Sequence, residues 1–171
     1  MILVTLVSAL VACGPGDASG TTGLIREDNL ELTSVFEEQD AIPTEYTCDG
    51  DELSPPLTID GLPAEARTLA LIVDDPDAPG GTFDHWVAFD IPPSEEIPQD
   101  VGRLGTAGRN SAGGLGYKGP CPPSGTHRYI FRVYALDTEL GLAEGATKEE
   151  VLTAAEDHVV GQGTLVGTYS R

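Results

Sequence analysis

The chain has 171 residues, which is the length of a single ordinary domain. It carries 28 acidic and 9 basic residues, so its formal net charge is −19. Such a chain offers no basic face to a phosphate backbone or to an anionic membrane surface, which argues against nucleic-acid binding and electrostatic membrane binding. Hydrophobic residues make up 40% of the chain, enough to fill a core. The many carboxylates beside only two lysines suggest adaptation to high salt.

The N-terminal residues have the pattern of a processing signal. Residues 1–12 form an apolar run that is too short to span a bilayer but suits a signal peptide. Residues 10–13 read LVAC, which resembles the lipobox of secreted lipoproteins, and residues 13–29 are rich in glycine, as in a flexible tether. We therefore predict an extracytoplasmic protein whose only membrane attachment is a lipid on Cys13. The alternative is a buried N-terminal strand with an ordinary cysteine, in a cytoplasmic protein.

The three cysteines are an odd number, which fits a separate role for one of them. If Cys13 carries lipid, Cys48 and Cys121 remain as a pair in an oxidising compartment. We predict that these two lie close together and form a disulfide. The alternative is two buried free thiols.

Residues 30–171 have the pattern of one mainly β domain. Alternating or continuous apolar runs rich in β-branched and aromatic residues predict strands; these runs cover 30–36, 68–75, 85–91, 127–137 and 164–169. Prolines make 42–57 a loop, and 92–125 is a long stretch rich in glycine and proline. A loop of that length inside a compact domain is usually functional.

One helix is predicted near the C-terminus. Thr147 and Glu150 fit a capping box, in which Thr147 is the N-cap and Glu150 the third helical residue. The helical pattern continues to Val160, and Gly161 ends it. One or two short helices beside several strands predict a sheet sandwich or a barrel.

Chemically distinctive residues cluster where the predicted strands begin or end. The segment Asp75-Pro76-Asp77-Ala78-Pro79 follows one strand, His85 opens the next, and His127-Arg128-Tyr129 opens the strand at 127–137. The segment GPCPPSG, residues 119–125, lies in the long loop. Side chains of a strand alternate between its faces, so His127 and Tyr129 should share one face. The same rule predicts a common face for His85, Val87 and Phe89.

These residue types suit a small anion. Prolines give rigid walls, and a neutral imidazole offers one donor and one acceptor whose positions a nearby carboxylate decides. Two histidines, a tyrosine hydroxyl and glycine amides could converge on a phosphate, a carboxylate or a lipid headgroup. We expect weak binding that strengthens as His85 or His127 becomes protonated near the ordinary histidine pKa of ~6.5. High salt would screen the repulsion from distant carboxylates.

The segments DDPDAPGGTFDHW and GYKGPCPPSGTHRYIFRVYALD closely resemble signatures of the phosphatidylethanolamine-binding protein (PEBP) family, in particular its prokaryotic Raf-kinase-inhibitor-like branch. The resemblance extends over residues 30–171. It implies a mainly β fold with a central antiparallel sheet, a second smaller sheet and short peripheral helices. It also implies a small pocket that takes anions such as phosphate, acetate or phosphoryl headgroups.

The resemblance also implies roles for individual residues. Asp75 would orient a histidine, Pro79 and Pro120 would form pocket walls, and the remaining pocket residues would be Asp77, His85, His127 and Tyr129. The arm between the signature motifs of eukaryotic members is shortened here to GGTFD, so their kinase-regulatory surfaces are not transferred. The family includes inhibitors of proteases and kinases, which makes a protein partner plausible.

The predicted function is therefore a non-catalytic module that binds a small anionic or phosphorylated ligand, without cofactor or metal, with regulation of a partner protein as a candidate role. One alternative is a hydrolase that uses Ser124, Thr126 or Cys121 beside His127, although no nucleophile elbow is present. The other is a metal enzyme in which His85, His127 and Asp75 form a two-histidine, one-carboxylate triad.

Overall fold

The computed structural model describes residues 29–171. The predicted leader at 1–12, the lipidation candidate Cys13 and the tether up to residue 28 lie outside the described residues. Within 29–171, no helix is both long and apolar enough to cross a membrane.

The strands form two antiparallel sheets. The central sheet has five strands in the order β6-β4-β3-β7-β8; they are β3 (Thr68–Asp75), β4 (Phe83–Ile91), β6 (Thr106–Ala107), β7 (Thr126–Leu136) and β8 (Val159–Ser170). The smaller sheet has the order β1-β2-β5; its strands are β1 (Glu31–Thr33), β2 (Leu57–Asp60) and β5 (Glu96–Ile97). The helices of the described part are the 3-10 turn η1 (Thr44–Tyr46) and α1 (Lys148–Ala155). This is the predicted mainly β fold with a central and a smaller sheet.

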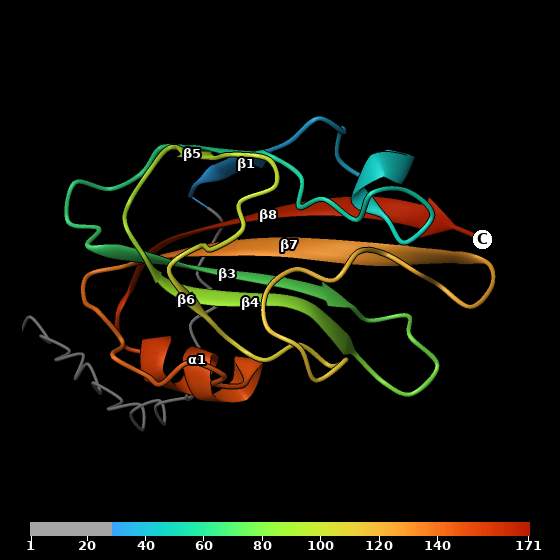
Figure 1. Ribbon diagram of the computed structural model, residues 1–171. Coiled ribbons are helices and arrows are strands. Elements are labelled where there is room, and N and C mark those ends of the chain that lie inside the picture. The colour runs from blue at the N-terminus through green and yellow to red at the C-terminus, as the bar shows by residue number, and fades with distance from the viewer. Residues whose placement is uncertain (1–28) are drawn as a thin grey trace, which may run out of the picture.

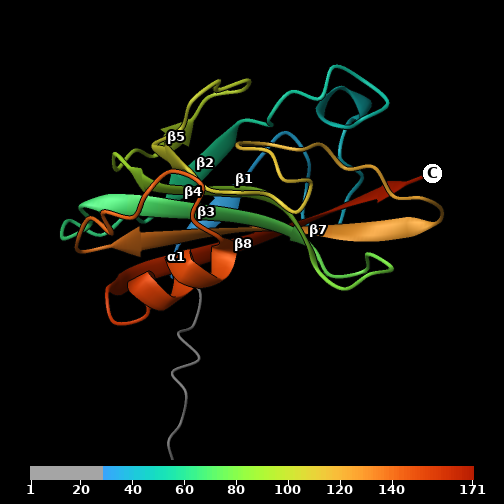
Figure 2. The same ribbon diagram turned by 60° about the horizontal axis from the view of Figure 1, so that its bottom comes forward.

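The molecule has three layers, because both faces of the central sheet are covered. The small sheet lies on one face and α1 on the other (Figures 1 and 2). Successive residues of β3 enter different cores: Leu71 packs toward the small sheet, whereas Ile72 packs with Val151 of α1. Burial on both faces explains why the sequence of β3 is almost continuously apolar.

The predicted strands at 68–75 and 127–137 correspond closely to β3 and β7, and the capping box of Thr147 and Glu150 is present. Other elements differ from the prediction: β8 begins at Val159 and not at residue 164, and β5 and β6 were not predicted. The strand expected at 30–36 is reduced to β1, and β2 was not predicted. The helix predicted to reach Val160 ends at Ala155, because Val159 already pairs with Leu136 in the central sheet. Tertiary pairing with β7 overrides the local helical pattern there.

Candidate functional site

A cavity of about 170 Å³ lies at the end of the central sheet where β3 stops and where β4 and β7 begin. Each of its walls comes from a different part of the chain. The lining residues are Asp75, Ala78, Pro79, Phe83, His85, Lys118, Gly119, Cys121, Pro122, Pro123, His127 and Tyr129. Antiparallel pairing of β3 with both β4 and β7 brings these distant segments together. Of the seven predicted ligand-binding residues, five line this cavity.

His127 is oriented by Asp75. The His127 Nδ1 atom lies 2.7 Å from Asp75 Oδ2, and both side chains are buried. The other oxygen, Asp75 Oδ1, accepts a hydrogen bond of 2.8 Å from the backbone N–H of Asp77. With both carboxylate oxygens engaged, the proton of a neutral His127 ring sits on Nδ1. Nε2 of His127 has no hydrogen-bond partner among residues 29–171.

His85 is oriented by a backbone carbonyl. Its Nδ1 lies 2.6 Å from the carbonyl oxygen of Lys118, so Nδ1 donates and Nε2 is left without a partner among the described residues. Burial lowers the pKa of His85, and the Lys118 carbonyl and the Asp75 charge only partly oppose that effect. His85 is therefore a neutral imidazole at neutral pH, with an acceptor nitrogen on Nε2.

A β-bulge turns the side chain of His85 into the cavity. The prediction that His85 shares a face of the sheet with Val87 and Phe89 was therefore wrong. In β3 and β4, Val73 pairs with Trp86 but Asp74 pairs with Asp84, so His85 is an extra residue in β4. The bulge reverses the alternation at this point. His85 consequently shares the cavity with Tyr129, and it does not share the face of Val87, which packs toward α1.

Aromatic rings surround His85. The Phe83 ring centroid lies 4.8 Å from that of His85, and the Tyr129 ring meets His85 edge-on at 5.1 Å. Burial raises the pKa of Tyr129, so the phenol stays neutral. Its buried hydroxyl forms no hydrogen bond to another side chain of the described residues.

Two predicted ligand-binding residues lie outside the cavity lining. Asp77 forms a two-pronged ion pair with Arg128, with Nη2–Oδ1 and Nε–Oδ2 distances of 2.7 and 2.8 Å. The hydrogen bonds from Arg128 lower the pKa of Asp77 to about 2. Pro120, predicted as a wall, is buried but does not line the cavity, and its carbonyl accepts a hydrogen bond from the backbone N–H of Cys48. The nearby prolines that do line the cavity are Pro122 and Pro123.

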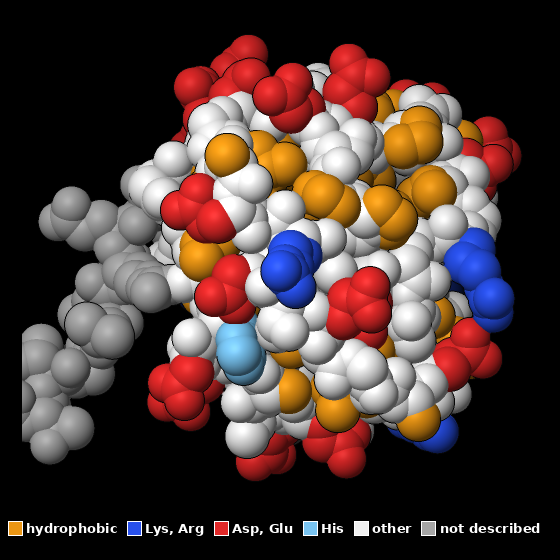
Figure 3. Space-filling model, turned by 90° about the vertical axis from the view of Figure 1, so that its left-hand side faces the viewer, with side chains coloured by type: hydrophobic (Ala, Val, Ile, Leu, Met, Phe, Trp, Pro, Cys, Tyr) orange, Lys and Arg blue, Asp and Glu red, His pale blue; other side chains and the backbone are white. Residues whose placement is uncertain are grey.

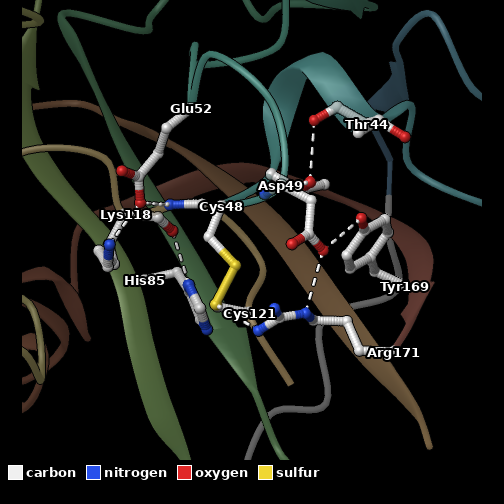
Figure 4. The surroundings of a disulfide bond; sticks show 11 residues. Thr44, Cys48, Asp49, Glu52, His85, Lys118, Cys121, Tyr169 and Arg171 are labelled. Carbon is white, nitrogen blue, oxygen red and sulfur yellow. Dashed lines mark hydrogen bonds and ion pairs between the residues drawn. A yellow bond between two sulfur atoms is a disulfide. The ribbon is translucent and has the colours of Figure 1, made fainter. Parts of the chain in front are cut away.

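A disulfide between Cys48 and Cys121 ties the cavity wall to the loop at 47–53 (Figure 4). Glu52 reinforces this attachment, because its Oε1 accepts from Lys118 Nζ at 2.5 Å and from the backbone N–H of Gly119 at 3.1 Å. The Lys118 interaction lowers the pKa of Glu52. Sequence reasoning missed Glu52 and Lys118: Lys118 lies within the quoted signature GYKGPCPPSG, but nothing in the local sequence pairs it with Glu52. Their shared position beside the two cysteines becomes visible only in the fold.

Two of the three nucleophile candidates considered from sequence are engaged elsewhere in the described structure. Cys121 is in the disulfide, and the Thr126 hydroxyl is hydrogen-bonded to Ser170. Residues 29–171 contain no cluster of three or more histidine, cysteine or acidic side chains arranged to hold a metal ion. The proposed triad fails geometrically because Asp75 and His127 use their facing atoms on each other. The arrangement offers two oriented imidazole nitrogens inside an otherwise largely apolar cavity.

The fold and this cavity define a small β-sheet protein with a histidine-containing ligand pocket. A family model described as "Phosphatidylethanolamine-binding protein" matches residues 32–170. The chain therefore belongs to the phosphatidylethanolamine-binding protein family.

Known relatives agree with this assignment. A UPF0098 protein of Methanothermobacter thermautotrophicus is 56% identical over 146 residues, which cover 81% of this chain and 97% of the relative. A UPF0098 protein of Pyrococcus abyssi is 48% identical over 155 residues, covering 85% and 87% of the two chains.

Two crystal structures share the fold. A phosphatidylethanolamine-binding protein homologue of Chlamydia trachomatis superposes with a TM-score of 0.80 at 38% identity, covering 85% of this chain and 99% of the other. YbcL of E. coli gives a TM-score of 0.76 at 29% identity, covering 84% and 99%.

Proposed function

We propose that this protein is a non-catalytic binding module for a small anion or a phosphoryl group. One observation carries the proposal: both buried imidazoles use Nδ1 on protein acceptors, so both Nε2 atoms are left for a ligand. Two oriented nitrogens in a small cavity can recognise the oxygens of phosphate or carboxylate. Within residues 29–171, no serine, threonine or cysteine side chain is hydrogen-bonded to His85 or His127, which favours binding over turnover.

The protonation states of site and ligand are coupled in this proposal. A neutral Nε2 accepts a hydrogen bond, so it suits an acid that still carries a proton, whereas a protonated Nε2 donates to a fully ionised oxygen. The basic side chains near the cavity are already paired, Lys118 with Glu52 and Arg128 with Asp77. They add little net positive charge, so we expect weak binding that tightens as the pH falls.

Calorimetric titration with inorganic phosphate and with phosphoethanolamine, between pH 5 and pH 8, tests the proposal. We expect the dissociation constant to fall as the pH is lowered, and binding to be lost in H85A and in H127A. H158A is the matched control, because the third histidine is half-exposed and pairs with Asp137 instead of lining the cavity. Folded wild-type protein that binds neither probe at any pH would refute the proposal.

The regulatory and anchoring roles predicted from the sequence extend this proposal. We infer that the cavity rim could contact a partner protein, and that a lipid on Cys13 would hold the domain at the outer face of the cell membrane. Fractionation of cells that express the full chain tests the anchor. Wild-type protein in the membrane fraction together with C13A in the soluble fraction is the expected result, and equal distribution of the two would contradict it.

A further inference from the structure

The bulge in β4 decides which side chain enters the cavity. Without the extra residue, the pairing of Val73 with Trp86 would continue as Asp74 opposite His85 and Asp75 opposite Asp84. Because side chains alternate along a strand, that register would turn His85 toward α1. It would also place the Asp84 carboxylate beside Asp75. The bulged register exchanges the two: His85 faces the cavity, and Asp84 faces the helix side.

On the helix side, Asp84 meets Lys148. The Lys148 Nζ atom lies 2.5 Å from Asp84 Oδ1 and 3.1 Å from Asp74 Oδ2. Asp74 and Asp84 are directly opposite each other on neighbouring strands, an arrangement that is unfavourable for two like charges. A cation between them removes that cost. All three side chains are at most 22% exposed, so solvent weakens these ion pairs less than pairs at the surface.

The position of Lys148 within α1 is unfavourable for a positive charge. It is the first residue of α1, where the helix dipole disfavours a positive charge. Figures 1 and 2 show α1 lying against the face of the central sheet opposite the small sheet. Lys148 therefore gains nothing from its helix and gains two carboxylates from the sheet. It is also one of only two lysines in the chain, and the other, Lys118, lines the cavity.

The backbone groups at the bulge are also satisfied. The Asp84 N–H donates to Ser111 Oγ at 2.8 Å, and the Ser111 N–H donates to the Asp84 carbonyl at 2.9 Å. The Lys118 N–H donates to the His85 carbonyl, also at 2.9 Å. These bonds compensate for the ladder bonds that a bulge interrupts. They support the bulged backbone, but no charged side chain among them selects Asp84 for the helix side.

We propose that Lys148 is a positioning residue of the cavity: by binding Asp84 and Asp74 from the helix side, it selects the β4 register that turns His85 into the pocket. Lys148 is not among the lining residues, so it acts on a ligand only through His85. The effect on ligand affinity rests on the proposed function. The effect on the position of His85 does not.

NMR of the histidine rings in wild type and K148M tests the proposal. In wild type, His85 should be the Nδ1–H tautomer with NOE contacts to the rings of Phe83 and Tyr129. In K148M we expect those contacts to disappear and the phosphate dissociation constant to rise at least about tenfold. K148R should restore both. R132M is the matched control, because Arg132 binds Asp74 but not Asp84, and it should keep the wild-type contacts and affinity.

Each outcome bears on a different claim. Folded K148M that keeps the His85–Tyr129 contacts overturns the positioning role. If K148M does not fold, K148Q removes the same positive charge while keeping a polar side chain and both carboxylates, and folded K148Q that retains the contacts overturns the role equally. Wild-type protein that shows the ring contacts but binds no phosphate refutes the proposed function, while the ring contacts of the variants still decide the role of Lys148.

Discussion

At the scale of single residues, the Asp75–His127 pair is the most constrained part of the cavity. The Asp75 carboxylate accepts a hydrogen bond from the His127 ring through Oδ2 and one from the backbone N–H of Asp77 through Oδ1. Because Asp75 is 3% exposed and His127 is 7% exposed, water cannot replace either bond without rearrangement. The carboxylate therefore fixes both the ring and its tautomer.

The substitution D75N should reverse the tautomer of His127. An amide N–H facing Nδ1 forces the ring proton onto Nε2, and loss of the buried charged bond should cost about 1–3 kcal/mol of unfolding free energy. Long-range 1H–15N NMR reads the tautomer, and urea unfolding reads the stability. D77N is the control: it breaks the more exposed pair with Arg128, should cost roughly 1 kcal/mol at most and should leave the tautomer unchanged. An unchanged tautomer in D75N would contradict this account.

His85 should make stability depend on pH. Burial lowers its pKa in the folded protein, whereas the unfolded chain has a pKa of ~6.5. Between these two values the unfolded state binds more protons, so the free energy of unfolding falls as the pH drops below ~6.5, and this fall stops below the folded pKa. Denaturant unfolding in phosphate-free buffer at several pH values measures it. H85N should lack this component, and H158N should retain it; a wild-type and H85N difference that does not change with pH would refute the prediction.

At the scale of elements, the cavity depends on loops that are fastened to strands. The wall at 118–123 has no regular structure, yet it is held by the disulfide, by Glu52 and by two backbone bonds to β4 and the loop at 47–53 (Figure 4). Arg171 adds a contact from the end of the chain, since it reaches Cys121 Sγ and Asp49. The rigidity of this wall comes from cross-links between elements.

Loss of the disulfide should therefore affect both stability and binding. The bond joins residues 73 positions apart, and its removal typically costs about 2–4 kcal/mol. We expect reduction, or the double substitution C48S/C121S, to lower the unfolding free energy by that amount and to weaken phosphate binding. Guanidinium unfolding with and without reductant measures the first effect. The double variant should not respond to reductant, and wild-type protein that is equally stable in both conditions would contradict the prediction.

At the scale of the whole molecule, net charge is the dominant feature. Acidic side chains are spread over the face shown in Figure 3, with few basic ones between them. Two of the basic residues, Lys148 and Arg132, form ion pairs with Asp74. Fewer basic residues therefore remain to offset the negative charge of the surface. Mutual repulsion of the carboxylates opposes the compact state at low ionic strength.

We therefore predict that salt stabilises this protein. The Debye length falls from about 10 Å at 0.1 M to about 3 Å at 1 M, so most surface repulsion should be screened over that interval. The thermal unfolding midpoint should rise steadily as potassium chloride is added from 0.1 to 1 M. An uncharged osmolyte at matched osmolality is the control and should give a smaller rise. A midpoint that is flat or falls with potassium chloride would contradict the prediction and the proposal of adaptation to high salt.

Much of the fold was predictable because its signals are local. The apolar run at 68–75 and the aromatic and β-branched run at 127–137 specify β3 and β7, and the pattern of Thr147 and Glu150 specifies the start of α1. The short strands were not predictable, since two to four residues carry no periodicity. The premature end of α1 was missed for a different reason: Val159 and its neighbours pair with β7, a contact that the local sequence does not reveal.

By itself, the amino-acid sequence determined the chemistry of this protein: its charge, its principal strands, and the presence of Asp75, His127 and Tyr129 at strand ends. Only the tertiary structure decided which of these residues meet. Strand alternation alone would turn His85 toward the helix, and Pro120 and Asp77 looked as suitable for the cavity as Pro79 did. The physical reason is that register depends on partners distant in the chain, and one extra residue in a strand moves a side chain from one face of a sheet to the other.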